Sequence, residues 1–353
     1  MAANQQYVVQ HYFAPLRTDI TMHYVEACPQ GEIRATLLCV HGFPDSWFGY
    51  RKVIPALAAA GYRVVVPDMR GYGSTSVPRE EKAYAMEEIC KDLEALLDVL
   101  FVEKVVIIGH DWGGTCVWSF AMHYPERVLG VAAFCTPYFP WRPENPWPRM
   151  RANVDSRFNY QIYFLGQAAQ AELERDYYRT VRCMIRGTSD KDNEAAGDFM
   201  RMPWRPTKDG GALVNFPRGI SRSEMLTEAE EREYATSFAR SGFFGMLSWY
   251  RNVERNWKWN TSTEGKVFKV PCLMVTAGRD ATLPPSMTKH MPGYMEDYTQ
   301  HDVLEAGHWV LQERPEECSK ALLSWLQAKS ALFEGPSATS STSAPASASP
   351  ARL

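Results

Sequence analysis

The segment that most constrains this chain is an apolar run followed by a glycine-rich turn around one aspartate. Residues 105–108 read Val-Val-Ile-Ile, as expected of a strand buried on both faces of a parallel sheet. The motif GHDWGG follows directly at residues 109–114. Its small residues, two before and two after Asp111, permit a tight strand-to-helix turn that lifts the central side chain above the end of the strand. The segment therefore predicts an α/β fold with a carboxylate nucleophile at Asp111.

Other parts of the chain also indicate an α/β fold. Apolar runs at residues 37–40, 64–66 and 271–276 predict further strands. Residues 86–100 carry apolar side chains at three- and four-residue steps, which predicts a helix with one face on the sheet. Pro315 begins a second helix of this kind. The alternation predicts a mostly parallel sheet flanked by helices.

Residues 136–265 interrupt this alternation. They contain no buried strand run but several helical stretches, and Thr227-x-x-Glu230 is a capping box that begins one of them. They also hold six of the eleven tryptophans, some of which should line a cleft. We expect a helical cap over a core formed by residues 1–135 and 266–330. Residues 331–353 are rich in Ser, Ala and Pro, which predicts a disordered tail.

Composition limits the partners and the location. A formal net charge of −3 provides no basic surface for a nucleic acid. We expect a cytoplasmic protein without a membrane span, because there is no secretory signal and no apolar stretch of about 18 residues. The last residues, Ala351-Arg352-Leu353, are similar to a peroxisomal signal of the S-K-L type, so a peroxisomal import receptor is a candidate partner. The cysteines form no C-x-x-C pair and are expected to be buried free thiols in a reducing compartment: Cys28, Cys39, Cys90, Cys116, Cys135, Cys183, Cys272 and Cys318.

A carboxylate nucleophile limits the reaction. Attack on an ester or amide carbonyl would give an anhydride, whereas attack on a saturated carbon that carries a leaving group gives an alkyl ester. That ester must then be hydrolysed, which requires a base for water. Asp280 follows the late strand and His308 comes after it, so the order of Asp111, Asp280 and His308 is that of an α/β-hydrolase triad. We expect His308 to deprotonate water and Asp280 to orient His308.

Two backbone amides are the expected oxyanion hole. The sequence HGFP at residues 41–44 follows a predicted strand, and its turn can present the N–H of Phe43 beside the N–H of Trp112. A plain β-to-α turn is the alternative interpretation of this segment. His110-Asp111 also resembles the metal-binding doublet of phosphohydrolases, but that doublet needs a helix and further ligands. We therefore expect no metal and no cofactor.

Together these motifs resemble the soluble epoxide hydrolases of the α/β-hydrolase family. The resemblance runs from about residue 5 to 330, through HGFPDSWFGYR, DMRGYGSTS, GHDWGG and AGHW and through cap residues 158–164 and 249–257. It is strongest to the C-terminal hydrolase part of the vertebrate enzyme, whose N-terminal phosphatase activity is not expected here.

The resemblance implies a reaction and further site residues. Lipophilic epoxides, such as fatty-acid or aryl epoxides, would react with water to vicinal diols through an ester on Asp111. In the family, two cap tyrosines donate a proton to the epoxide oxygen, and the matching positions are Tyr160 in NYQIYF and Tyr250 in SWYRN. Substrate contacts are implied at Gln161, Phe164 and Trp309.

Two alternatives remain open. A haloalkane or haloacid dehalogenase would use the same aspartyl ester, but it needs N–H donors for a halide and would leave the tyrosine pair unexplained. A non-catalytic α/β-hydrolase receptor would keep the fold for ligand sensing, but it has no need of Asp111, Asp280 and His308 together. The sequence is compatible with a homodimer.

Overall fold

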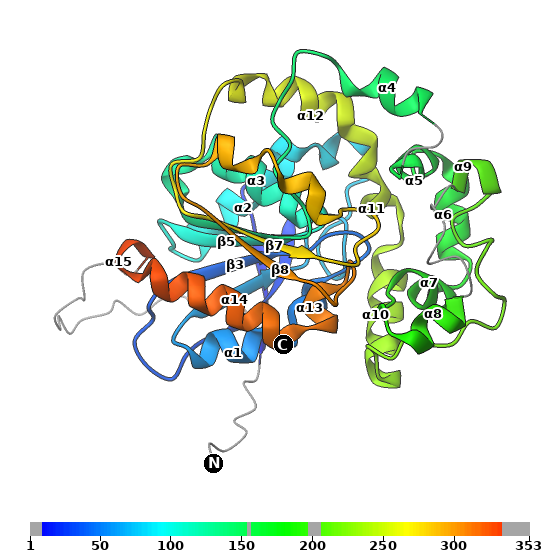
Figure 1. Ribbon diagram of the computed structural model, residues 1–353, viewed down its shortest axis with the longest axis horizontal. Coiled ribbons are helices and arrows are strands. Elements are labelled where there is room, and N and C mark those ends of the chain that lie inside the picture. The colour runs from blue at the N-terminus through cyan, green and yellow to red at the C-terminus, as the bar shows by residue number, and fades with distance from the viewer. Residues whose placement is uncertain (1–8, 154–156, 197–205, 334–353) are drawn as a thin grey trace.

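A twisted sheet forms the centre of the molecule in the computed structural model, which describes residues 9–153, 157–196 and 206–333 (Figure 1). Within these residues the sheet has eight strands in the order β1-β2-β4-β3-β5-β6-β7-β8. The pairs β1–β2 and β2–β4 are antiparallel and the other pairs are parallel, which confirms the predicted mostly parallel sheet. The strands are β1 (Gln10–Pro15), β2 (Thr21–Ala27), β3 (Thr36–Val40), β4 (Arg63–Pro67), β5 (Val105–His110), β6 (Val128–Phe134), β7 (Cys272–Ala277) and β8 (Tyr298–Val303).

Successive side chains of the central strands enter two different apolar cores. Leu38 and Ile107 point to the core beneath α2 (Met86–Val99) and α3 (Trp112–His123). Leu37 and Ile108 point to the core beneath α1 (Ile54–Ala59) and α14 (Pro315–Ala328) on the other face (Figure 1). The runs are continuously apolar because both faces of these strands are buried. The predicted starts of α2 at residue 86 and of α14 at Pro315 are confirmed.

Four strands, β1, β2, β6 and β8, are not among the runs named in the sequence analysis. In β1 and β8 most residues are exposed or half-buried, because both strands lie at the edges of the sheet. The strand β2 extends the sheet as the antiparallel partner of both β1 and β4. The edge strands β1 and β8 therefore have neither the continuous apolar run nor the composition of a buried strand.

Between β6 and β7 the described part of residues 136–265, which we call the cap, is helical and lies over one end of the sheet (green to yellow in Figure 1). The predicted capping box is confirmed: Thr227 Oγ1 accepts from the Glu230 amide at 3.2 Å, and the Glu230 side chain accepts from the Thr227 amide at 2.7 Å. The cap helices are α4 (Pro146–Ala152), α5 (Asn159–Tyr163), α6 (Gln167–Glu174), α7 (Tyr177–Met184), α8 (Asp190–Ala196), α9 (Pro206–Asp209), α10 (Glu228–Ser241), α11 (Phe244–Ser248) and α12 (Val253–Trp259).

A polar network joins the cap to the core. Arg51 of the core donates to Glu230 of α10 at 2.6 Å and to Gln312 at 2.9 Å. Tyr234 of α10 donates to Asp45 at 3.0 Å and accepts from Gln312 at 3.0 Å. Burial raises the pKa of Asp45 to about 7. Because these groups are largely buried and partnered, α10 is fixed on the core by directional contacts as well as by apolar packing.

The C-terminal boundary differs from the prediction. Residues 331–333 were expected to open the disordered tail, but they belong to α15 (Ser330–Phe333), and Phe333 packs its buried ring 5.1 Å from that of Trp325. The predicted start of the tail at residue 331 is therefore wrong, because Phe333 is part of the apolar core. The remainder of the tail, with Ala351-Arg352-Leu353, lies outside the described residues.

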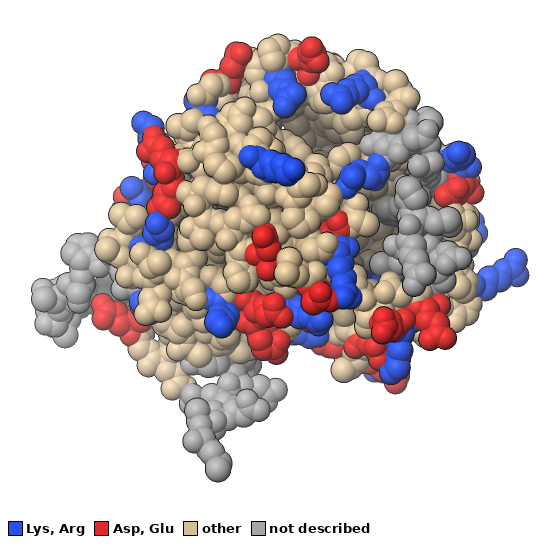
Figure 2. Space-filling view, viewed as in Figure 1, with Lys and Arg blue, Asp and Glu red and all other residues tan. Residues whose placement is uncertain are grey.

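The surface charges, the cysteines and the helix lengths can be compared with the sequence analysis. On the face shown in Figure 2, basic and acidic side chains are interspersed. All eight cysteines are free, and seven are buried as predicted, whereas Cys28 is exposed. Of the helices in the described ranges, none has both the length and the apolar character needed to cross a membrane.

Candidate active site

Asp111 lies at the junction of β5 and α3 in a tight turn. Its φ is +54°, in the left-handed region that a non-glycine residue rarely adopts, so the turn stores backbone strain at this residue. The turn also requires a close approach of two chain segments. A Cβ at Gly113 would lie 2.0 Å from the carbonyl oxygen of Val40 on the neighbouring strand β3, so no side chain fits there. The strand-to-helix turn predicted around Asp111 is therefore present.

The turn after β3 holds one oxygen of the Asp111 carboxylate. The Phe43 amide donates to Asp111 Oδ1 at 2.8 Å. A Cβ at Gly42 would lie 2.4 Å from the same oxygen, so glycine is needed for this approach. Trp112 is the first residue of α3, where the amides have no partner within the helix. The two amides expected to form an oxyanion hole thus belong to turns that flank the Asp111 carboxylate.

Three strand ends bring the triad together. His308, in the loop after β8, places Nε2 3.4 Å from Asp111 Oδ2 and Nδ1 2.8 Å from Asp280 Oδ2. Asp280 follows β7, and its other oxygen accepts from the amides of Thr282 and Leu283, both at 2.9 Å. The Asp280 side chain is fully buried, whereas 23% of the His308 side chain is exposed. The geometry suits an orienting acid behind a histidine that a small molecule can reach.

The charges in this row stabilise one another. Burial opposes ionisation of Asp111, but the hydrogen bond and the charge of His308 outweigh it and lower the pKa of Asp111. The charge and the hydrogen bond of His308 also lower the pKa of Asp280, and its two amide donors lower it further. Burial also opposes protonation of His308, yet the Asp280 carboxylate and then Asp111 raise the pKa of His308 well above its usual value. The resting site is therefore an imidazolium between two carboxylates.

Two cap tyrosines lie next to this row. Tyr160 of α5 and Tyr250, which follows α11, are both buried, and their ring centroids are 6.1 Å apart. The Tyr250 ring meets the rings of Phe43 and Trp112 edge-on at 5.1 Å. Burial raises the pKa of both phenols, and the charge of Asp111 adds to the rise in each. Both hydroxyls therefore remain protonated and lie in the field of the Asp111 carboxylate.

The three residues predicted to contact substrate have different surroundings. Gln161 donates its side-chain amide to the Tyr160 hydroxyl at 3.4 Å. Phe164 is fully buried and packs against Tyr250 at 5.1 Å. Trp309 is also buried, and its indole N–H donates to the Met184 carbonyl of α7 at 2.8 Å. Their contact with a substrate stays a prediction.

Sequence reasoning missed two groups at the edge of the site. His110, which immediately precedes Asp111, directs Nε2 at the backbone oxygen of His308 at 2.7 Å. The Glu313 carboxylate accepts from the amide of Gly307 at 3.0 Å and from the amide of Thr188 in the cap at 2.9 Å. The His110 contact with His308 and the Glu313 contact with Thr188 join residues far apart in the chain. In the sequence His110 is marked only by its position beside Asp111, and no local pattern marks Glu313.

Comparison with known proteins agrees with the fold. The model of the alpha/beta hydrolase fold family matches residues 35–315. Bifunctional epoxide hydrolase 2 of Mus musculus is 40% identical over 333 residues, which are 94% of this chain and 57% of that protein. Epoxide hydrolase A of Mycobacterium tuberculosis is 36% identical over 87% of this chain and 94% of its own length. The crystal structure of epoxide hydrolase A from Mycobacterium thermoresistibile superimposes with a TM-score of 0.78 at 34% identity, covering 91% of this chain and 98% of that one.

These matches define first a fold class and then a narrower group within it. The chain belongs to the α/β-hydrolase fold family and, within it, to the epoxide hydrolases. It spans a little over half the length of the mouse relative and nearly the full length of the mycobacterial ones.

Proposed function

We propose that this protein hydrolyses lipophilic epoxides to vicinal diols through an alkyl ester on Asp111. The observation that carries the proposal is the arrangement around the carboxylate, with the His308 imidazole 3.4 Å away and two buried protonated phenols, Tyr160 and Tyr250, in its field. A carboxylate supplies the nucleophile for a saturated carbon, and phenols supply the proton for an alkoxide.

In the first step an Asp111 oxygen forms a bond to one epoxide carbon. The bond between that carbon and the epoxide oxygen breaks, and its electron pair goes to the oxygen. Tyr160 and Tyr250 hydrogen-bond this oxygen, and one of them transfers its proton to it. Ionised Asp111 is the reactive form, and its lowered pKa keeps it ionised.

In the second step a water attacks the ester carbon of Asp111. His308 takes one proton from the water, and the amides of Phe43 and Trp112 hold the tetrahedral oxyanion. Collapse breaks the ester bond and releases the diol, whose new oxygen comes from the carboxylate. Before this attack the resting proton of His308 passes to the tyrosinate, which restores the phenol and leaves the imidazole neutral. The two protons of the water then end on the leaving alkoxide and on His308, which restores the resting site. The ester no longer carries the Asp111 charge, so the pKa of His308 is lower in the intermediate than in the resting site, which favours base catalysis.

A single turnover in heavy-oxygen water tests the proposal. With enzyme in excess over a styrene-type oxide or an epoxy fatty acid, the first diol should contain ordinary oxygen from Asp111, and solvent oxygen should appear in Asp111. In the His308→Gln variant the ester should accumulate as added protein mass. Solvent oxygen in the first diol would exclude the ester, and halide release from haloalkanes without diol formation would favour the dehalogenase reading instead.

A further inference from the structure

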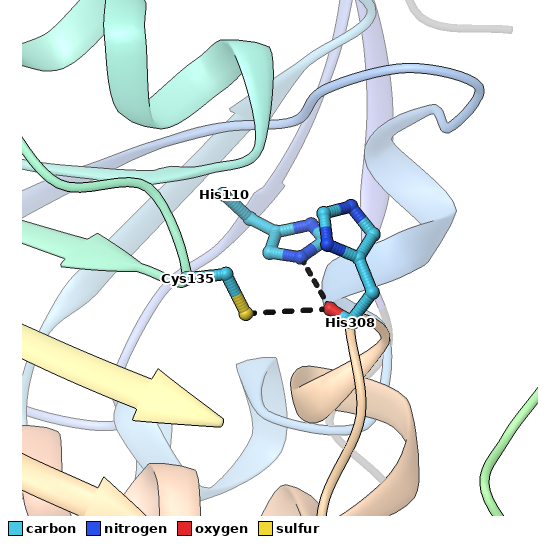
Figure 3. A group of neighbouring side chains, drawn as sticks. All are labelled: His110, Cys135 and His308. Atoms are coloured by element: carbon cyan, nitrogen blue, oxygen red, sulfur yellow. Dashed lines mark hydrogen bonds between the residues drawn. The ribbon is translucent and has the colours of Figure 1, made fainter. Parts of the chain in front are cut away.

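The backbone carbonyl of His308 is held by two side chains from the central sheet. His110 Nε2 lies 2.7 Å from this oxygen and Cys135 Sγ 3.5 Å from it (Figure 3). His110 ends β5, and Cys135 directly follows β6, its parallel neighbour. Both residues are 1% exposed. A carbonyl only accepts hydrogen bonds, so His110 must carry a proton on Nε2.

A metal site is the other interpretation of this cluster. The ligand atoms of His110, Cys135 and His308 lie within 4.8 Å of one another, and nitrogen with sulfur suits zinc. However, His110 Nε2 and Cys135 Sγ are both directed at the His308 carbonyl oxygen, and not at a position between the three side chains where a metal ion would lie (Figure 3). The two nitrogens of His308 already face Asp280 and Asp111. The cluster therefore fits a hydrogen-bonded clamp on the backbone.

We call the hydrogen bonds from His110 and Cys135 to the His308 carbonyl the clamp. They hold the backbone of the residue whose imidazole must be positioned. His308 lies in a loop, and its ring must reach Asp280 on one side and the ester of Asp111 on the other. The loop is also held at Gly307, whose amide donates to Glu313, and at Trp309, whose indole donates to the cap. Those two contacts depend on a side chain of α13 (Val310–Glu313) and on the cap, whereas the carbonyl contact is anchored in the sheet. It is made to the backbone of His308 itself, whereas the other two are made by its neighbours.

We propose that His110 is a positioning residue for ester hydrolysis: by donating to the His308 carbonyl it keeps the imidazole between Asp280 and the ester of Asp111. This proposal rests on the proposed function. It assigns His110 no contact with the substrate, and it separates the two steps of the reaction. Ester formation uses Asp111 and the tyrosines and needs from His308 only its nearby charge, so it should depend little on the exact position of the imidazole.

The charge state of His110 agrees with this role. Burial, followed by the nearby charge of His308, lowers the pKa of His110 to about 4, against the opposing effect of Asp111 and Asp280, which also face it. His110 is therefore neutral at physiological pH and exists as the Nε2–H tautomer. Its ring lies 4.9 Å from that of His308, and a neutral ring adds no repulsion to the imidazolium there.

Two substitutions separate the hydrogen bond from the packing. His110→Leu keeps the bulk and removes the donor, whereas His110→Gln offers an amide N–H near the place of Nε2. His290→Leu is the matched control, since its Nε2 lies 2.7 Å from the Tyr138 carbonyl, a contact outside the triad. In rapid-quench single turnovers, His110→Leu should form the ester at the parent rate and hydrolyse it about 10- to 100-fold more slowly. His110→Gln should recover most of the loss, and His290→Leu should show none.

A second readout does not need activity. The Nδ1 proton of His308, bound to Asp280, should give a strongly downfield NMR signal in the parent and in His110→Gln, and a shifted or broadened signal in His110→Leu. Equal slowing of both steps by His110→Leu, or an unchanged hydrolysis rate, would overturn the proposal. If the parent forms no ester, the proposed function fails, and the NMR comparison still decides whether His110 positions His308. If His110→Leu does not fold, Cys135→Ala and His110→Gln are measured in the same way. The clamp is refuted if Cys135→Ala keeps the NMR signal and the hydrolysis rate of the parent while His110→Gln hydrolyses the ester as slowly as expected for His110→Leu.

Discussion

Replacing the hydroxyls of Tyr160 and Tyr250 is the sharpest perturbation of the proposed chemistry. Tyr→Phe keeps the ring, and the rings carry the packing: Tyr250 contacts Phe43 and Trp112 edge-on at 5.1 Å, and Tyr160 contacts Phe164 at 5.6 Å. The free energy of unfolding should therefore change by only about 1 kcal/mol per hydroxyl. What is lost is a donor to the oxygen that gains charge as the epoxide opens.

The magnitude follows from that loss. A hydrogen bond to an ionised group contributes about 1.5–3 kcal/mol, and each 1.36 kcal/mol is about tenfold in rate. Either single variant should thus form the ester about 10- to 150-fold more slowly, since one phenol still donates. The double variant leaves the alkoxide without a proton source, and we expect a loss of about 10²- to 10⁴-fold, as for other general acids. Ester hydrolysis should be almost unchanged, because His308 and Asp280 perform it.

Rapid-quench mass spectrometry of single turnovers measures both rate constants. Tyr163→Phe is the matched control: Tyr163 lies on the same helix as Tyr160, but its hydroxyl donates to Glu172 at 2.9 Å. That variant should form the ester at the parent rate. A double variant that opens epoxides as fast as the parent would refute the assignment of the tyrosines, and so would equal losses in Tyr163→Phe.

Two further predictions concern the turn and the histidine. Gly113→Ala places a Cβ 2.0 Å from the Val40 carbonyl, so urea denaturation should show a loss of about 1–3 kcal/mol or more; parent-like stability with full activity would contradict the strained turn. The pH dependence should differ between the steps: ester hydrolysis needs neutral His308 and should slow as pH falls through the pKa of His308 in the intermediate, whereas ester formation needs ionised Asp111, whose pKa is lowered, and should persist to lower pH. Ester that accumulates in acid would support this order, and parallel loss of both rate constants would contradict it.

The sequence could predict those parts of the site that follow from local pattern. The turn at Asp111 requires small residues at fixed spacing, and a buried parallel strand requires a continuous apolar run, so both are visible in a single sequence. The chain order of Asp111, Asp280 and His308 is likewise readable. Tyr160 and Tyr250 have no local pattern of their own among seventeen tyrosines. Their selection depended on the resemblance to a family.

The rest depends on contacts between distant residues. No sequence pattern marks Glu313 or Thr188. The fold places the Glu313 carboxylate between the cap and the loop that carries His308. The resemblance implies a substrate contact for Trp309. No local pattern predicts that its N–H is directed at the Met184 carbonyl, a direction set by how α7 lies on the core. The edge strand β8 is polar because only one of its sides is paired, and its pattern is therefore that of a loop.

The pairing of β6 with β7 has a consequence for how this molecule can change. Parallel neighbours need a connection that returns from the end of one strand to the start of the next at the opposite end of the strands, and here that connection contains the cap. The entropy of closing such a connection grows only with the logarithm of its length, by about 0.6 kcal/mol per doubling. The cap can thus be lengthened, shortened or exchanged at little thermodynamic cost, provided that Thr188 and Met184 keep their contacts. Under the proposed function the reacting groups lie at the strand ends and the cap covers them, so the cap can change while the strand ends stay the same.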